Sequence, residues 1–387
     1  MYKITSKENN GRLIISVSGR IDSANAADAE ADIRKAAEGF TGTITIDAPD
    51  LEYISSAGLR IILRLRKEHP DTSIINCNTE VYEIFDMTGF TEMMNISKAY
   101  RKISVDGCEV IGEGANGIVY RIDPDTIVKL YKNPDALEEI HNERELARKA
   151  FVMGIPTAIP YDVVQVGNCY GSVFELLNAT SFAKLLAAHP EDTVKLARES
   201  VDILKAMHST ELKPGELPDK KAEAIVWAEF CRPYLPEETG EKLVNLVKEI
   251  PERHNMLHGD FHVKNIMRQN DENLLIDMDT LAMGHPVFEF SATFLAYVGF
   301  GCIDHGSTTK FLGVPYQQMY TFWDATLSTY FGTEDKSVLK DIENKAAVIG
   351  YARLLRRTVR RENNPELVEY CKKTLTELVP AVDKLYF

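Results

Sequence analysis

The sequence lacks the features that would place it at once among secreted, membrane or zinc proteins. Its six cysteines are scattered over 387 residues with no C-x-x-C spacing, which argues against a disulfide framework and a zinc site. The longest apolar run, around residues 290–302, is shorter than the about 18 to 20 residues that a membrane span needs. The first residues do not resemble a signal peptide. We therefore expect a cytoplasmic protein with reduced thiols and no membrane partner.

Positive charge is also scarce. The chain has 44 lysines and arginines against 58 aspartates and glutamates, a formal net charge of −14, which would repel a nucleic-acid backbone. Five arginines near the end stand at helical spacing, and we interpret them as a solvated helix face or as partners for the many acids. They are Arg353, Arg356, Arg357, Arg360 and Arg361. We expect no nucleic-acid partner.

No linker rich in glycine, serine or proline divides the chain, although its length predicts two or three domains. The patterns described below place the domains at residues 1–102, 103–178 and 179–387. In the first domain, strands are predicted over 2–6, 12–21, 42–47 and 73–76, and helices over 24–37, 59–65 and 81–88. Ser23 is positioned to cap the first helix. This alternation predicts an α/β domain.

Two segments of the first domain, YISSAGLR at 53–60 and FDMTGF at 85–90, resemble the STAS domains of anti-sigma factor antagonists. The resemblance implies a mixed sheet with helices on one side, a protein partner, and phosphorylation of a serine where a loop meets a helix. Phosphate suits that place because free N–H groups and the helix dipole favour negative charge.

The sequence departs from the STAS pattern at this serine. The residue before the glycine, which is often the phosphorylated one, is Ala57, and Ser55 replaces the usual aspartate. Ser56 is therefore the first candidate phosphorylation site and Ser55 the second. The alternative is that both serines only cap the following helix.

A glycine-rich segment, G-x-G-x-x-G-x-V, opens the second domain with Gly112, Gly114 and Gly117. Such a pattern alone also fits a plain hairpin. The strand predicted over 126–131 follows it, however, and carries Lys129. Glycines let a backbone approach phosphates, and a lysine neutralises their charge. Together these features predict a nucleotide site.

A lysine among apolar strand residues needs an acidic partner when it is partly buried. The helix predicted over 136–152 offers several glutamates. Glu143 falls on the face marked by its apolar residues, whereas Glu145 does not. We therefore predict that Lys129 pairs with Glu143; the alternative is that Glu143 is a solvated helix charge.

The segment HGDFHVKN at 258–265, followed by IDMD at 276–279, carries the residues that phosphoryl transfer from a metal-bound nucleotide needs. Asp260 is suited to accept the proton of an attacking hydroxyl, and Asn265 and Asp277 to hold Mg²⁺ against the phosphates. The alternative is a plain turn, with Asp277 merely ending a strand.

These motifs resemble the aminoglycoside phosphotransferase and choline kinase-like branch of the protein-kinase fold, whose protein-kinase members carry H-R-D instead. The resemblance implies an α+β bilobal domain, ATP and Mg²⁺ as cofactors, and a hinge at Glu175 and Leu177 whose backbone holds the adenine. We also expect Glu289 to brace the catalytic loop. Few residues separate Asp277 from Gly284, too few to bind an extended peptide, so the expected acceptor is a small molecule.

We therefore expect an ATP- and Mg²⁺-dependent phosphotransferase that acts on a hydroxyl of a small molecule. Asp260, Lys129 and Glu143 are its expected catalytic residues, and the STAS domain serves regulation or docking to a protein. Two alternatives stay open. One is a serine kinase for Ser56 or Ser55 of its own or a partner's STAS domain; the other is a nucleotide-binding partner-switch regulator with little turnover.

Overall fold

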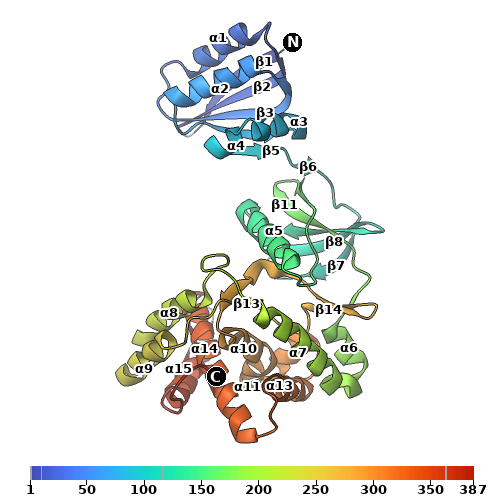
Figure 1. Cartoon of the computed structure of the whole chain (residues 1–387), viewed down its shortest axis with the longest axis vertical. Helices are drawn as coiled ribbons and strands as arrows, with labels where there is room; N and C mark the ends of the chain where they lie inside the picture. The colour runs from blue at the N-terminus through green and yellow to red at the C-terminus, as the bar shows by residue number, and fades with distance from the viewer. Residues whose placement is uncertain (1, 10, 115–116, 362–363) are drawn as a thin grey trace. The chain divides into compact units, whose positions relative to one another are not determined.

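The structure is a computed structural model that describes residues 2–9, 11–114, 117–361 and 364–387. Its contacts divide the chain into two compact units. The first comprises Met1–Ser104 with Val163–Gly167, and the second comprises Val105–Asp162 with Asn168–Phe387. Figure 1 shows the elements of both units.

The first unit contains a five-stranded mixed sheet in the order β1-β2-β3-β4-β5, with helices on one side, as the resemblance to STAS domains implies. Strand β1 is antiparallel to β2, and the other neighbours are parallel. The strands are β1 (Tyr2–Asn9), β2 (Arg12–Ile21), β3 (Thr43–Ile54), β4 (Ser73–Cys77) and β5 (Ile96–Lys98). The helices are α1 (Ala26–Ala37), α2 (Ser56–Glu68), α3 (Thr79–Met87) and α4 (Phe90–Met93).

One face of this sheet forms the core of the unit because apolar side chains alternate along the strands. In β2, Leu13, Ile15 and Val17 are buried and pack with residues of the helices. Helix α2 approaches the sheet so closely that a Cβ at Gly58 would lie 2.6 Å from the Ile54 side chain. Glycine at this position therefore serves packing.

The ends of two helices in this unit bear on the predictions. Helix α1 begins at Ala26 rather than Ala24, and Ser23 does not cap it, because the Asp22 carboxylate accepts hydrogen bonds from the N–H groups of Ala24 and Asn25 and fixes a turn there. Ser55 is the N-cap of α2, and its hydroxyl accepts a hydrogen bond from the Gly58 N–H. Ser56 is the exposed first residue of α2.

The second unit opens with antiparallel strands in the order β11-β9-β8-β7, and helix α5 (Leu137–Val152) packs against β11. The strands are β7 (Glu109–Glu113), β8 (Gly117–Asp123), β9 (Thr126–Tyr131) and β11 (Cys169–Glu175). The short β6 (Arg101–Lys102) pairs in parallel with β10 (Asp162–Val166), most of which is grouped with the first unit.

The rest of the second unit is mainly helical. Its helices are α6 (Phe182–Ala188), η1 (Pro190–Asp192), α7 (Thr193–Ser209), α8 (Lys220–Cys231), η2 (Arg232–Tyr234), α9 (Glu237–Lys248), η3 (Met278–Thr280), α10 (Val287–Phe294), η4 (Leu295–Gly299), α11 (Phe300–Ile303), α12 (His305–Leu312), α13 (Tyr316–Phe331), α14 (Lys336–Arg361) and α15 (Pro365–Leu378). The short strands are β12 (Thr180–Ser181), β13 (Asn255–Leu257), β14 (Ile266–Gln269), β15 (Glu272–Leu275) and β16 (Ala282–Gly284).

The apolar run around residues 290–302 forms α10, η4 and α11 and lies in the core of this unit. Phe290, Phe294 and Tyr297 are buried and contact the ring of Trp323 in α13. Within the described ranges, we find no helix that is both long enough and apolar enough to cross a membrane. The aromatic residues of this run are therefore packing residues.

Candidate active site

Lys129 is the centre of the charged cluster in the second unit. Its ammonium Nζ lies 2.9 Å from Glu143 Oε1 and 2.6 Å from Asp277 Oδ1. Burial by itself lowers the pKa of Lys129, but the Asp277 and Glu143 carboxylates raise it above its ordinary value. The lysine therefore stays charged and joins β9, α5 and the chain just before η3.

Helix α5 delivers Glu143 to this cluster from its buried face. Ile140, Leu146 and Ala150 are buried with it, and Glu143 itself is 4% exposed. Glu145 instead faces solvent and pairs with Arg148 three residues on. The structure thus contains the ion pair that the periodicity of the helix predicts, and the reading of Glu143 as a solvated charge is wrong.

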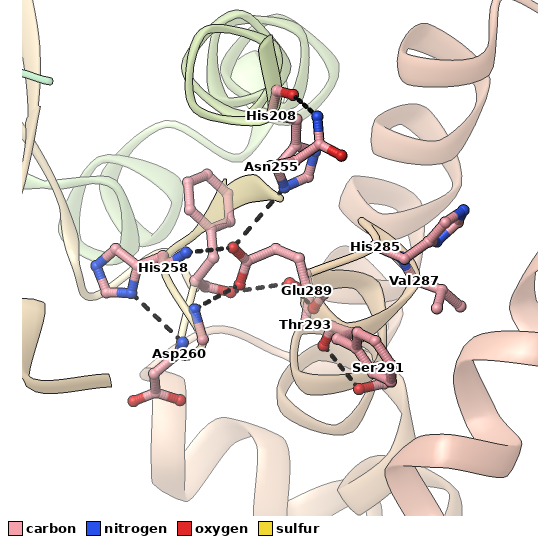
Figure 2. Close-up of polar contacts among 12 residues, drawn as sticks. His208, Asn255, His258, Asp260, His285, Val287, Glu289, Ser291 and Thr293 are labelled. Carbon is pink, nitrogen blue, oxygen red and sulfur yellow. Dashed lines mark hydrogen bonds and ion pairs between the residues drawn. The ribbon is translucent and has the colours of Figure 1, made fainter. Parts of the chain in front are cut away.

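The loop that carries Asp260 follows β13 and is held by Glu289 of α10. The fully buried Glu289 carboxylate accepts hydrogen bonds from the backbone N–H groups of His258 (2.6 Å) and Gly259 (3.0 Å). Burial raises the pKa of Glu289, but the neighbouring His208 and His258 lower it below its ordinary value. Figure 2 shows the Glu289 side chain reaching from α10 to the backbone of this loop. The expectation that Glu289 braces the loop is confirmed.

Gly259 is required by the path of the loop. Its φ is +81°, and a Cβ there would lie 2.4 Å from the Thr280 carbonyl oxygen. A side chain at this position would therefore be strained and would push the loop away from the segment after Asp277.

His258 joins the same two segments. Its Nδ1 accepts a hydrogen bond from the Asp260 N–H (3.4 Å), so its Nε2 carries the proton and donates to the Ile276 carbonyl (3.1 Å). The side chain is completely buried. His258 therefore fixes the spacing between Asp260 and the strand that ends at Asp277.

The Asp260 carboxylate points away from Glu289 (Figure 2). Its side chain is 45% exposed, and Oδ2 lies 3.5 Å from His262 Nε2. Burial raises the pKa of Asp260, but the hydrogen bond and electrostatic interaction with His262, followed by the interactions with His258 and Arg353, outweigh that effect and lower the pKa to about 2. The group is therefore an ionised, accessible proton acceptor at neutral pH.

Asn265 and Asp277 stand on adjacent backbone. The Ile276 N–H donates to the Asn265 carbonyl (3.0 Å), and Asp277 is the next residue, with φ +67°. Asn265 Nδ2 donates to the Asp260 carbonyl (3.0 Å), which leaves the side-chain Oδ1 as the donor atom for a cation. No cluster of three histidine, cysteine or acidic side chains is arranged for a metal among the described residues. An amide oxygen and a carboxylate nevertheless fit Mg²⁺, which is commonly held by one or two carboxylates together with phosphates and water.

Asp279 is a neighbouring acid. Burial, followed by the negative charge of Asp277, raises its pKa to about 7, because Lys129 offsets these effects only in part. The cluster therefore holds more negative charge than one lysine neutralises, which favours a cation at this place.

Three predicted nucleotide-binding glycines lie on the β7–β8 hairpin, and residues 115 and 116 of that motif lie outside the described residues. A Cβ at Gly117 would lie 2.6 Å from the Leu130 carbonyl oxygen, so glycine there serves the sheet. A Cβ at Gly112 or Gly114 would meet only ordinary contacts at 3.8 Å or more. These two glycines are therefore not explained by packing.

The predicted hinge follows β11. Glu175 is the last residue of that strand and is exposed, and Leu177 is half-buried two residues later. The Leu176 N–H between them donates to the Asp125 carbonyl (2.7 Å). The segment is thus fixed to the β8–β9 turn on one side.

Comparison with known proteins decides the family. A model of the phosphotransferase enzyme family matches residues 107–304, about half of the chain, and a STAS domain model matches residues 3–103. The chain belongs to the phosphotransferase enzyme family and carries a STAS domain.

Individual relatives agree with this division. The Bordetella bronchiseptica protein BtrV, named as an anti-sigma factor antagonist, is 30% identical over 101 residues, which cover 25% of this chain and 87% of that relative. The GDP complex of a point mutant of aminoglycoside 2'-phosphotransferase-IIIa matches with a TM-score of 0.50 at 13% identity, over 78% of this chain and 97% of that one. The wild-type GDP complex matches at 14% identity with a TM-score of 0.49, over 78% and 98%. The first of these structural matches shows a shared fold.

Arg353 lies at this site although no motif in the sequence indicates it. It was interpreted as part of a solvated face or as a partner for acids. In the structure its Nη1 lies 3.5 Å from the Gly259 carbonyl oxygen, and its guanidinium group lies over the Trp227 ring. For this arginine the reading as a solvated face is wrong, because α14 brings it to the loop of Asp260, an acid with which it interacts. One signal was available in the sequence: no acidic residue occurs from 344 to 361 to pair with these arginines.

His208 is a buried histidine near the end of α7. It is 6% exposed, its Nδ1 lies 2.8 Å from the Tyr330 hydroxyl, and its Nε2 lies 3.8 Å from Glu289 Oε2. It lies beside the Glu289 oxygen that accepts the His258 N–H, and so supports this carboxylate (Figure 2).

Proposed function

We propose that this protein is an ATP- and Mg²⁺-dependent phosphotransferase that transfers a phosphoryl group to a hydroxyl of a small molecule. The single observation that carries the proposal is the contact of Lys129 with both Glu143 and Asp277, at 2.9 and 2.6 Å. In kinase-like enzymes such a lysine positions nucleotide phosphates and such an aspartate binds their metal ion. Membership of the phosphotransferase family supports the same reading.

In this proposal, Asp260 orients the acceptor hydroxyl and takes its proton as the new bond to phosphorus forms. A carboxylate with a pKa near 2 is a weak base. It suffices because the transition state of phosphoryl transfer is largely dissociative, so the proton leaves late and positioning matters most. Asn265 and Asp277 would hold Mg²⁺, which supplies charge neutralisation at the phosphates when bound.

The nucleotide would lie between the glycine hairpin and the hinge. Gly112, Gly114 and Gly117 would cover the phosphates with backbone, and the backbone at Glu175 and Leu177 would hold the adenine edge. The boundaries proposed from the sequence, 1–102, 103–178 and 179–387, then correspond to the STAS, nucleotide-binding and acceptor-binding parts.

A small acceptor is supported by the short path after Asp277. The chain forms the single turn η3 and then enters β16, which pairs with β13. This part of the chain offers no extended segment on which a peptide could be bound.

The STAS domain would dock a protein or regulate the enzyme, with Ser56 and then Ser55 as candidate phosphorylation sites. The exposed position of Ser56 in the first turn of α2 supports this order. The Ser55 hydroxyl is engaged as a cap.

The proposal is tested by measuring ATP consumption with Mg²⁺ over a panel of amino alcohols, sugars and sugar acids. Asp260→Ala should lower kcat by about 10²–10⁴-fold while ATP binding stays unchanged, because it removes proton transfer and hydroxyl positioning. Arg148→Gln, on the exposed face of α5, is the control and should behave as wild type. An Asp260→Ala enzyme with full activity would refute the role of Asp260.

A further inference from the structure

The surface around the Asp260 carboxylate is basic, although the chain as a whole is strongly acidic. Arg353 Nη1 lies 3.5 Å from the carbonyl of Gly259, the residue before Asp260. Arg357 follows one helical turn later on α14, is exposed, and lies over the Phe300 ring. Two cations of α14 therefore project beside the proposed catalytic loop.

The loop of Asp260 itself carries further basic side chains. His262 Nε2 lies 3.5 Å from Asp260 Oδ2, and the His262 ring packs edge-on against Phe311. The exposed Lys264 places its ammonium over the same Phe311 ring. An acceptor whose hydroxyl reaches Asp260 therefore has basic side chains of α14 and of the loop nearby, in addition to the acids Asp277 and Asp279.

Among the described residues, Arg353 and Arg357 interact with Asp260 but form no ion pair with an acidic side chain. Leaving aside residues 362 and 363, which the structure does not describe, no carboxylate forms an ion pair with Arg353, Arg357 or Lys264. The chain has 58 acidic and 44 basic residues, so most surface cations could find an acidic partner. Three cations without an ion pair near one carboxylate are therefore unusual here. Burial, followed by the charges of Arg353 and Arg361, lowers the pKa of Arg357, and the opposing effect of Asp260 offsets this only in part, so the arginines repel one another. This repulsion is relieved when an anion binds between them.

We propose that the acceptor is a small molecule with a carboxylate or phosphate group, which Arg353 and Arg357 bind while its hydroxyl contacts Asp260. The proposal rests on the proposed function and adds the acceptor class to it. A guanidinium binds either oxyanion through two parallel hydrogen bonds, which also fixes the orientation of the hydroxyl. A polyamine acceptor would meet like charge at the same place.

The experiment compares matched acceptors with Mg²⁺ and ATP: glycerol, glycerate and glycerol 3-phosphate, then glucose, gluconate and glucose 6-phosphate, with kanamycin as the polyamine. At least one anionic member should exceed its neutral parent in kcat/KM by about tenfold or more, as one charge-assisted hydrogen bond predicts. The carboxylate and phosphate arms distinguish the two sources of the anion. Preference for the neutral parents or for kanamycin overturns the proposal but leaves the phosphotransferase function standing.

Variants of Arg357 test the assignment of the site. Arg357→Gln should raise KM for the anionic acceptor about 10- to 100-fold, with KM for ATP unchanged, and Arg357→Lys should restore part of the loss. Arg148→Gln is the matched surface control. An equal effect of Arg357→Gln on neutral and anionic acceptors would show a merely structural role and overturn the proposal.

A second measurement covers the case in which none of these acceptors is phosphorylated. Calorimetric titration with glycerate and glycerol 3-phosphate, at saturating non-hydrolysable ATP analogue and Mg²⁺, should show binding that Arg357→Gln weakens by about tenfold or more. Absence of such binding, or transfer of phosphate to Ser55 or Ser56 alone, overturns the small anionic acceptor. If the proposed phosphotransferase function itself is wrong, the wild-type protein will consume no ATP with any acceptor, whereas a wrong acceptor class leaves ATP consumption with other acceptors.

Discussion

Glu289→Gln is the substitution whose cost the structure defines best. The buried carboxylate accepts from two backbone N–H groups, at 2.6 and 3.0 Å. Glutamine keeps one acceptor oxygen but turns an NH₂ group toward the other N–H, which leaves that buried donor unsatisfied at a cost of about 1–3 kcal/mol. The remaining bond also loses its charge assistance, so we expect a total loss of ~2–4 kcal/mol in the free energy of unfolding of the second unit.

The assay combines calorimetry of the full chain with steady-state kinetics. Tm of the second transition should fall by about 2–4 °C for each kcal/mol. Asp260 should lose its position, so kcat should fall more than KM for ATP changes. Glu369→Gln on α15, an exposed partner of Lys372, should stay within about 0.5 kcal/mol of wild type. A Glu289→Gln protein with wild-type Tm and kcat would refute the bracing role.

Three further changes have defined outcomes. Gly259→Ala forces a Cβ to within 2.4 Å of a carbonyl oxygen at φ +81°, so it should lower stability by about 2 kcal/mol or more in urea unfolding; wild-type stability would contradict the loop geometry. Gly117→Ala should destabilise the sheet, whereas Gly112→Ala should leave Tm unchanged and weaken ATP binding, and equal effects on Tm would contradict the distinction. The raised pKa of Asp279, about 7, means that the folded state loses stability as pH rises from about 4 to 7. In EDTA, Asp279→Asn should therefore be more stable than wild type at pH 8 but not at pH 4, and a pH-independent difference would contradict this assignment.

Local periodicity and motif spacing predicted much of this molecule. The alternation in β2 and the inner face of α5 each depend on residues close in sequence, and they gave the buried sheet face and the Glu143 partner of Lys129. The helix start after β2 was predicted too early, because the Asp22 turn competes with a serine cap that the sequence favours equally well. Short-range sequence patterns thus predict which helices and strands form better than they predict the residues at which these begin and end.

Contacts between distant segments were predictable only where a family pattern supplied them. Glu289 lies 31 residues after His258, and its bracing role was expected from the family resemblance rather than from the spacing of residues. Arg353 lies 94 residues from Gly259, outside any motif, and a row of arginines on a helix fits a solvated face as well as a binding site. The two readings differ in whether acidic partners lie nearby. On the described part of α14, no acidic residue of the helix forms an ion pair with its arginines. For Arg353 and Arg357, which also lie near Asp260, this lack of acids is the reason for the proposal that an anionic acceptor binds there.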